Sequence, residues 1–333
     1  MTGVAPSRVT GFDALRGIAA LCVMIFHAAV LENGGVGIGK AYLAVDFFFL
    51  LSGYVMARTY EARFATGMRL RDFLQARLSR LYPAMALGGA IGLILLRQKM
   101  PESWTLVATT NMLLLPVLAG ADTYPLNVAS WSILFELIAN ILHQLAFHAI
   151  RAKTLMMMLI PLGLILAAVA LAGDIDVGSS PRTFYAAIPR VLFSYLFGIV
   201  LWRRWRDSPG FRWPAWLTFA ALPGYFSLIW MLNIRGGWAD LLFIFLVSPL
   251  VLGAGLTASG GRLGARLGEI SFPLYAVQFP VIELLQHRGY PMAVRLAACL
   301  LLAIGIAYLP PAARRLRSGA YGPFAPARKQ ASD

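Results

Sequence analysis

The sequence predicts an all-α polytopic membrane protein with about ten transmembrane helices, on the grounds of composition, apolar run length and loop charge. Hydrophobic residues fill 59% of the 333 positions and charged residues only 13%, whereas about a quarter of the residues in soluble domains are charged. Several apolar runs reach the roughly 20 residues that a helix needs to cross a bilayer. The basic residues gather in a few connecting segments, which is how orientation is encoded in membrane proteins.

The apolar runs predict ten spans. They lie at residues 12–31, 42–59, 82–97, 131–150, 154–173, 186–203, 214–232, 238–257, 269–286 and 292–309. An eleventh run, 104–119, is shorter and contains polar residues and a proline. We expect this run to be a re-entrant or interfacial segment, because irregular backbone at membrane depth is tolerated where protein buries it or a cavity adjoins it.

Loop charge predicts the orientation of these spans. Six arginines lie between residues 58 and 80, and further clusters occupy 203–212, 262–266 and 314–329. Placing these segments inside puts both termini in the cytoplasm, which requires an even number of spans. The net charge of +14 is explained by this arrangement, so we predict no nucleic-acid partner. No cleavable signal peptide is recognised.

The chain is expected to form one transmembrane domain over residues 1–320, followed by a disordered cytoplasmic tail over 321–333. Cys22 and Cys299 both lie in apolar runs, so neither a disulfide nor a metal site is predicted.

The first span contains two ionisable residues that a lipid-facing helix should avoid. Arg16 and His27 are eleven residues apart, which is three helical turns plus about 20°, so they share one face about 16 Å apart. Charged groups at membrane depth are costly and mostly functional. Asp13 lies three residues before Arg16, where a local ion pair can form instead. A lone histidine can likewise be a packing residue.

The second span begins with Asp46, at a depth similar to that of His27. A carboxylate there can orient an imidazole and stabilise its protonated form. Ser52 and Gly53 then interrupt a very apolar helix. Glycine lets a ligand or another backbone approach closely, so these two positions indicate either a binding site or helix packing through small residues.

The third and fourth spans add further polar candidates. Arg77 and Arg80 precede the third span, and arginine forks bind phosphate in a bidentate manner. The alternative reading is sorting of positive charge to the inside, with contacts to anionic lipid headgroups. Glu136 lies about two turns into the fourth span and needs a partner or a role there.

Five stretches resemble the acyltransferase 3 family, membrane-bound enzymes that O-acylate polysaccharides and other acceptors in bacteria. They are "FDALRGIAALCVMIFH", "DFFFLLSGYVMA", "RLSRLYPA", "SWSILFELIAN" and "LGEISFPLYAVQFPVI". The resemblance implies a multi-pass protein of the bacterial inner membrane, an acyl-CoA donor entering from the cytoplasm and no permanently bound cofactor. It implies that Arg16 and His27 are both needed and that the basic loop contacts the nucleotide end of CoA. One departure is Gln278, where many relatives carry a histidine; glutamine cannot titrate.

We therefore predict a transmembrane O-acyltransferase, most simply an acetyltransferase, that acts on a hydroxyl of a cell-surface or exported glycan such as a lipopolysaccharide. His27 is the predicted general base, and either Asp46 or Glu136 supports it. The donor site is predicted to contain Arg16, Arg77, Arg80, Ser52 and Gly53. Transfer through an acyl-enzyme on Ser52 stays an alternative to direct transfer, and the acyl chain length, the acceptor and the oligomeric state stay open.

A protein of a different functional class could use the same ionisable residues. In a proton- or anion-coupled transporter or flippase, Arg16, His27 and Glu136 would form a path across the membrane. Such proteins show broken helices in two related halves, and no such repeat is found. A membrane subunit without activity is a third alternative. Binding of CoA thioesters separates the enzyme from the transporter.

Overall fold

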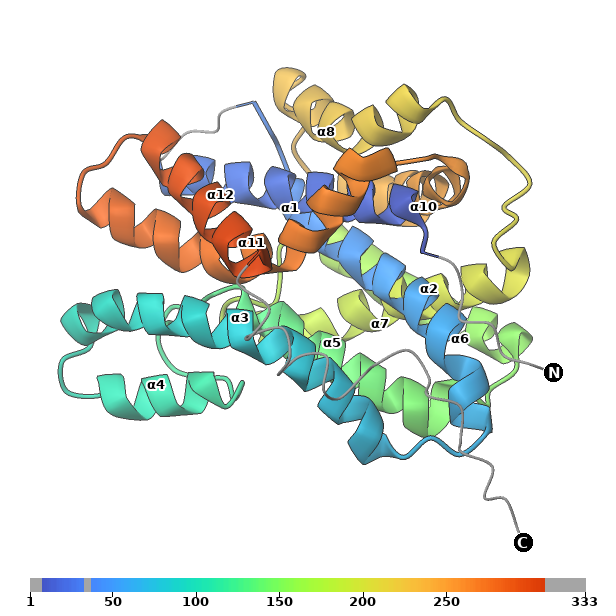
Figure 1. Ribbon diagram of the computed structural model, residues 1–333, viewed down its shortest axis with the longest axis horizontal. Coiled ribbons are helices and arrows are strands. Elements are labelled where there is room, and N and C mark those ends of the chain that lie inside the picture. Colours follow the sequence, from blue (N-terminus) through green and yellow to red (C-terminus); the bar gives the residue numbers. More distant parts are fainter. Residues whose placement is uncertain (1–7, 33–36, 309–333) are drawn as a thin grey trace, which may run out of the picture.

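The computed structural model describes residues 8–32 and 37–308, and this part of the chain consists of helices and their connections without any strand (Figure 1). The prediction of an all-α polytopic membrane protein is confirmed. Within the described residues, seven helical segments are long and apolar enough to cross a membrane, and two shorter apolar helices accompany them. The predicted tail over 321–333 lies outside the described residues.

The helical bounds agree with the predicted spans to within a few residues, except that three helices are longer. The helices are α1 (Thr10–Leu31), α2 (Ala44–Ala65), α3 (Leu70–Lys99), α4 (Trp104–Met112), α5 (Ser130–Leu142), α6 (Ala152–Ala172), α7 (Ala187–Trp205), α8 (Ala215–Met231), α9 (Trp238–Leu242), α10 (Ser248–Thr257), α11 (Gly261–His287) and α12 (Met292–Tyr308). Five-residue π turns continue α5 over His143–Phe147 and join α9 to α10 over Phe243–Val247. Short 3-10 turns precede α2 (Ala41–Leu43) and α7 (Phe184–Ala186).

The eleventh apolar run, 104–119, forms the short helix α4 and the loop after it. The nine residues of α4 are about 14 Å long, too short for a hydrocarbon core of about 30 Å. The helix lies beside the end of α3 (Figure 1), and the Asn111 side chain closes the loop after it. That amide donates to the Leu115 carbonyl oxygen at 3.1 Å, and its oxygen accepts from the Leu126 N–H at 3.1 Å. The short helix agrees with the expectation of a re-entrant or interfacial segment, which stays a prediction.

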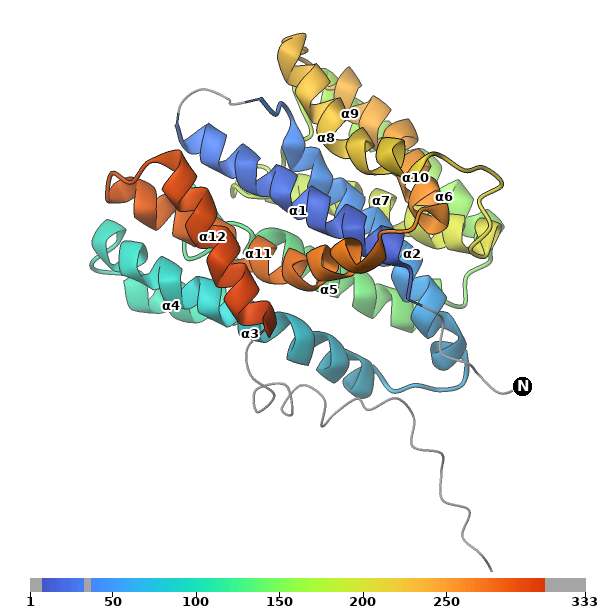
Figure 2. The same ribbon diagram turned by 45° about the horizontal axis from the view of Figure 1, so that its top comes forward.

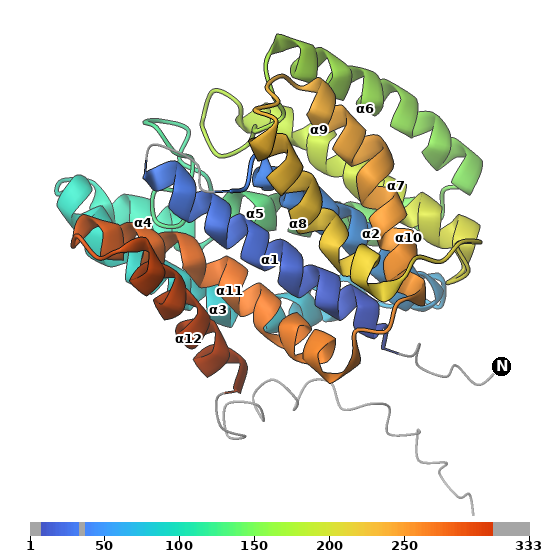
Figure 3. The same ribbon diagram turned by 90° about the horizontal axis from the view of Figure 1, so that it is seen from above.

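Helix α1 lies in the middle of the bundle, with α11 along one side (Figures 2 and 3). The two helices run parallel, because the Gly260 N–H donates to the Thr10 hydroxyl at one end and Gln286 donates to the Leu31 carbonyl at the other. We call the end where α1 and α11 begin the arginine-rich end, since the α2–α3 and α7–α8 connections also lie there. The other end is called the opposite end.

Helices α2 and α7 also run parallel and approach closely at two glycines. A Cβ atom on Gly53 would overlap the Tyr195 carbonyl oxygen, and a Cβ atom on Gly198 would overlap the Leu50 carbonyl oxygen. Gly53 therefore allows the two backbones to touch, and it does not line either pocket described below. Of the two interpretations of Gly53, helix packing has a contact in the structure, and a place in the donor site stays a prediction.

Gly53→Ala is expected to lower the thermal unfolding midpoint and the amount of folded protein in membranes. The added methyl group meets backbone atoms, so α2 and α7 must separate, and overpacking of this kind costs about 1–3 kcal/mol. The matched control is Gly224→Ala in α8, where no atom lies within 4 Å of the added Cβ. Equal thermal midpoints for the two variants would contradict the assigned packing role.

Candidate functional site

Two adjoining pockets open between α1, α2, α3, α5 and α11. The entrance pocket, of about 330 Å³, lies at the arginine-rich end, and the deep pocket holds about 120 Å³ of free space. Both are lined by Arg16, Arg80 and Phe272, which marks where they meet. The deep pocket is otherwise mostly apolar. The helices thus provide a continuous lining from the arginine-rich end into the interior.

Charged side chains surround the entrance pocket. Arg8, Arg16 and Arg80 face Asp13 and Glu269 there, so three positive charges against two negative charges leave a net charge of +1. Arg8 Nε lies 2.5 Å from Asp13 Oδ2. An Arg16 nitrogen donates to the Gly268 carbonyl at 2.8 Å and lies 3.8 Å from Asp13. The local contact between Asp13 and Arg16, which the sequence offered as an alternative, is thus present, although Arg8 is the closer partner of Asp13.

Arg77 and Arg80 differ in what they contact. The Arg77 guanidinium is buried, and it donates to Glu136 at 2.5 Å. Ser52 donates to the same carboxylate oxygen at 2.8 Å. Arg80 lines both pockets and has no ion pair within the described residues. Arg80 is therefore the more available anion ligand of the two, because the charge of Arg77 is already balanced.

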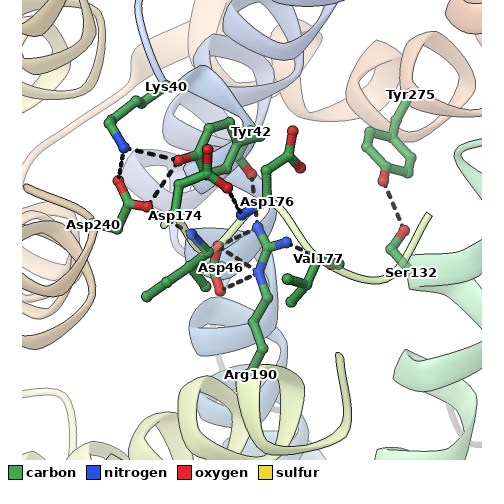
Figure 4. Close-up of polar contacts among 11 residues, drawn as sticks. Lys40, Tyr42, Asp46, Ser132, Asp174, Asp176, Val177, Arg190, Asp240 and Tyr275 are labelled. Atoms are coloured by element: carbon green, nitrogen blue, oxygen red, sulfur yellow. Dashed lines mark hydrogen bonds and ion pairs between the residues drawn. The ribbon is translucent and has the colours of Figure 1, made fainter. Parts of the chain in front are cut away.

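The far end of the deep pocket contains a pair of hydroxyl groups. Ser132 donates to the Ala129 carbonyl at 3.0 Å, and the Tyr275 hydroxyl lies 2.7 Å from the same serine oxygen (Figure 4). The Tyr275 ring meets the edge of Phe48 at a centroid distance of 5.7 Å. Since the serine proton points to the carbonyl, the tyrosine is the donor within the pair. These groups offer polar contacts in an otherwise apolar wall.

His27 lies beyond these pockets, nearer the opposite end. Its ring meets the Phe279 ring of α11 at 5.3 Å with perpendicular planes. Arg16 also contacts α11, at Gly268, so the prediction that Arg16 and His27 share one face of α1 is confirmed. The buried Nδ1 atom of His27 has no hydrogen-bond partner among the described residues. His27 does not line either pocket.

Asp46 pairs with an arginine instead of with His27. Arg190 of α7 is fully buried, and its Nε and Nη2 atoms lie 2.7–3.1 Å from the two Asp46 carboxylate oxygens (Figure 4). Arg190 also donates to the Val177 carbonyl at 2.9 Å, and the Trp131 ring lies 5.4 Å from its guanidinium carbon. The expected contact of Asp46 with His27 is therefore absent from the described structure.

Glu136 does not contact His27 either, because its carboxylate is engaged by Arg77 and Ser52 in the deep pocket. We expected one of these two carboxylates to orient the His27 imidazole. Neither does so in the described structure. The physical reason is the same in each case. A carboxylate at membrane depth is stabilised most by a full positive charge, and each carboxylate finds an arginine on a neighbouring helix.

Several residues of this region were missed by reasoning from the sequence. Arg190 and Arg295 lie inside predicted spans, and the rule that ionisable residues at membrane depth need partners would have singled them out. Arg8 lies outside the apolar runs, so the rule does not apply to it. Tyr275 lies inside an apolar run but is not charged, so the rule does not single it out either. They are identified only by the pockets they line.

Comparison with known proteins assigns most of the chain to one domain. The family model described as "Acyltransferase domain" matches residues 9–310. "Protein 2 in picA locus" of Rhizobium radiobacter is 40% identical over 87 residues, which is 26% of this chain and 44% of that protein. No solved structure matches the chain significantly.

Two further relatives have names that describe an activity. "Putative peptidoglycan O-acetyltransferase YrhL" of Bacillus subtilis is 35% identical over 79 residues, 23% of this chain and 12% of that protein. "Putative membrane-bound transacylase BcsY" of Komagataeibacter xylinus is 37% identical over 79 residues, 24% of this chain and 18% of that protein. The match thus covers less than half the length of each of these three relatives.

Proposed function

Because this chain belongs to the acyltransferase 3 family, whose domain spans residues 9–310, we propose that it moves an acyl group from cytoplasmic acyl-CoA to a hydroxyl group on the other side of the membrane. The chain is an acyltransferase and a multi-pass membrane protein by its family and its apolar helices. The donor, the base and the acceptor are the proposed parts. The membrane is proposed to be the bacterial inner membrane, with the arginine-rich end in the cytoplasm.

The observation that carries the proposal is the pair of adjoining pockets at the arginine-rich end. Phosphates of acyl-CoA would bind Arg8, Arg16 and Arg80 in the entrance pocket, where the net charge is positive. The pantetheine arm would extend along the deep pocket. The Arg77–Glu136 pair would form part of the wall and leave no unbalanced charge beside the arm.

The transfer step is assigned to His27. The imidazole removes the proton of the acceptor hydroxyl, and the hydroxyl oxygen forms a bond to the thioester carbonyl carbon. The carbon–sulfur bond then breaks and CoA leaves as the thiolate. The proton from the hydroxyl group stays on His27, which is now an imidazolium. His27 lies about 16 Å along α1 from Arg16, which separates the end that binds donor from the end that receives the acceptor.

The acceptor is proposed to be a glycan. One relative carries a name that specifies a peptidoglycan O-acetyltransferase, and an acetyl group is small enough for a deep pocket of about 120 Å³. Acetyl-CoA is accordingly the proposed donor, without any permanently bound cofactor.

Replacing Arg80 with glutamine is expected to weaken acetyl-CoA binding roughly 10- to 100-fold, because a charge-assisted hydrogen bond contributes about 1.5–3 kcal/mol. The measurement is acetyl-CoA-dependent thermal stabilisation of the protein in detergent, with dephosphorylated CoA thioester as the comparison ligand. Arg16→Gln should act in the same direction. The control is Arg71→Gln, on the same helix as Arg80 but in neither pocket. If Arg80→Gln and Arg71→Gln bind acetyl-CoA equally well, the proposed donor site is wrong.

A further inference from the structure

The hydroxyl groups of the deep pocket use their protons inside the protein. Among the described residues that line this pocket, the hydroxyl-bearing side chains are Ser52, Ser132, Ser271 and Tyr275. Ser52 donates to the Glu136 carboxylate, and Ser271 donates to a backbone carbonyl of its own helix, both at 2.8 Å. The Ser132 proton is taken by a backbone carbonyl, so Tyr275 donates to the Ser132 oxygen at 2.7 Å. These groups can therefore accept further hydrogen bonds from a ligand without breaking the ones they make.

The Ser132–Tyr275 pair lies at the deep end of this lining. Helix α11 begins at the arginine-rich end, and Tyr275 follows Phe272, where the two pockets meet, by three residues or about 4.5 Å. Helix α5 ends at the arginine-rich end, because the π turn after it contacts the last turn of α7. Ser132 therefore lies about 6 Å farther from that end than Glu136. A ligand that enters between the arginines reaches this pair last.

The proposed donor carries one polar group that suits an acceptor at this depth. The inference rests on the proposed function, in which the pantetheine arm of acyl-CoA extends along the deep pocket. This arm contains two secondary amides, and it ends in the thioester. A thioester carbonyl can only accept a hydrogen bond, whereas an amide N–H donates one. Binding the thioester carbonyl would require Tyr275 to give up its bond to Ser132, and binding the amide N–H does not.

We propose that the Tyr275 hydroxyl oxygen accepts a hydrogen bond from the donor's amide N–H that is nearest to the thioester. This oxygen accepts no hydrogen bond from any described residue, and its own proton is directed at Ser132 (Figure 4). Ser132 and Tyr275 are then positioning residues that fix how far the pantetheine arm enters. The Phe48 ring, 5.7 Å from the Tyr275 ring, adds an apolar wall beside the arm. The thioester extends beyond the pair toward the opposite end, where His27 lies.

The test is a thermodynamic cycle between one hydroxyl group of the protein and one amide of the ligand. Tyr275→Phe removes the hydroxyl group, and the matching ligand is an acetyl-CoA analogue in which an ester oxygen replaces the N–H of that amide. Affinities come from ligand-dependent thermal stabilisation of the protein in detergent. The unmodified protein is expected to bind the analogue about 3- to 10-fold more weakly than acetyl-CoA, the usual effect of one neutral hydrogen bond. In Tyr275→Phe this ratio is expected to shrink by the same factor.

Tyr225→Phe is the matched control, because this tyrosine donates to the Ala239 carbonyl at 2.6 Å and lines neither pocket. It is expected to lower the thermal midpoint of the ligand-free protein and to keep the full ratio between the two ligands. If Tyr275→Phe also keeps the full ratio, Tyr275 only joins α5 to α11 and the inference is wrong. Equal binding of the two ligands by the unmodified protein would overturn it as well.

Adenosine 3′,5′-bisphosphate separates this inference from the proposed function, because it carries nucleotide phosphates without a pantetheine arm. It is expected to stabilise the unmodified protein and Tyr275→Phe to the same extent. If acetyl-CoA and the bisphosphate both stabilise the protein but the ratio in Tyr275→Phe does not change, the inference fails and the donor site stands. If neither compound stabilises the unmodified protein, the proposed function fails, and the inference fails with it.

Discussion

Replacing His27 with alanine is expected to reduce acyl transfer about 10²- to 10⁴-fold, the usual contribution of a general base. Acetyl-CoA binding should stay unchanged, because His27 lines neither pocket. The measurement is transfer of radiolabelled acetyl groups in membranes that contain equal amounts of each variant. Loss of transfer with retained donor binding would place His27 in the chemical step.

His287→Ala is the matched control, since this histidine is exposed and also lies near the opposite end of the bundle. Its transfer rate should equal that of the unmodified protein. If His27→Ala keeps near-normal transfer at normal abundance, the general-base mechanism is wrong. If His27→Ala loses donor binding as well, the imidazole contributes to the donor site, and the separation between the two ends of α1 does not hold.

Asp46→Asn is expected to destabilise the folded protein by about 3–5 kcal/mol, because it leaves the fully buried Arg190 without a counter-charge. The thermal midpoint in detergent and the amount of protein in membranes should both fall. This result would show that Asp46 stabilises the folded protein. Normal abundance and stability together with lost transfer would contradict it and return Asp46 to the chemistry.

The double variant Asp46→Leu with Arg190→Met separates charge from packing. It should recover part of the loss seen in Asp46→Asn, because no uncompensated charge remains. Recovery stays incomplete, since the Val177 carbonyl loses its donor. A double variant as unstable as Asp46→Asn would show that the destabilisation comes from the lost hydrogen bonds and not from the unpaired charge.

The fold was largely predictable because a lipid-spanning helix needs both length and apolar composition, and both are local properties of the sequence. The predicted span 238–257 coincides with α9, the π turn and α10. The start of α3 was missed by twelve residues, at Leu70 and not at 82, because its first turns are rich in arginine. An apolar pattern detects only the part of a helix that faces lipid or the core.

The candidate site was predictable only in part. The common face of Arg16 and His27 follows from helical periodicity within one segment, and it is confirmed. The partners of Asp46 and Glu136 come from helices that are distant in sequence, and no local pattern specifies which charge meets which. Gly53 illustrates the same limit. A ligand site and helix packing both require another group to approach the Gly53 backbone closely. The sequence does not show that this group is the backbone of α7.

The Asp46–Arg190 pair also has a consequence for how the chain is made. Asp46 enters the membrane with α2, but its partner follows 144 residues later. At 5–20 residues per second, synthesis of that interval lasts on the order of 10 s. During this delay α2 can pack on α1, but the Asp46 carboxylate still lacks the arginine that balances its charge. The interior around α2 is therefore expected to reach its final packing only after α7 has been inserted beside it, so chains that stop before α7 should be less stable than the whole chain.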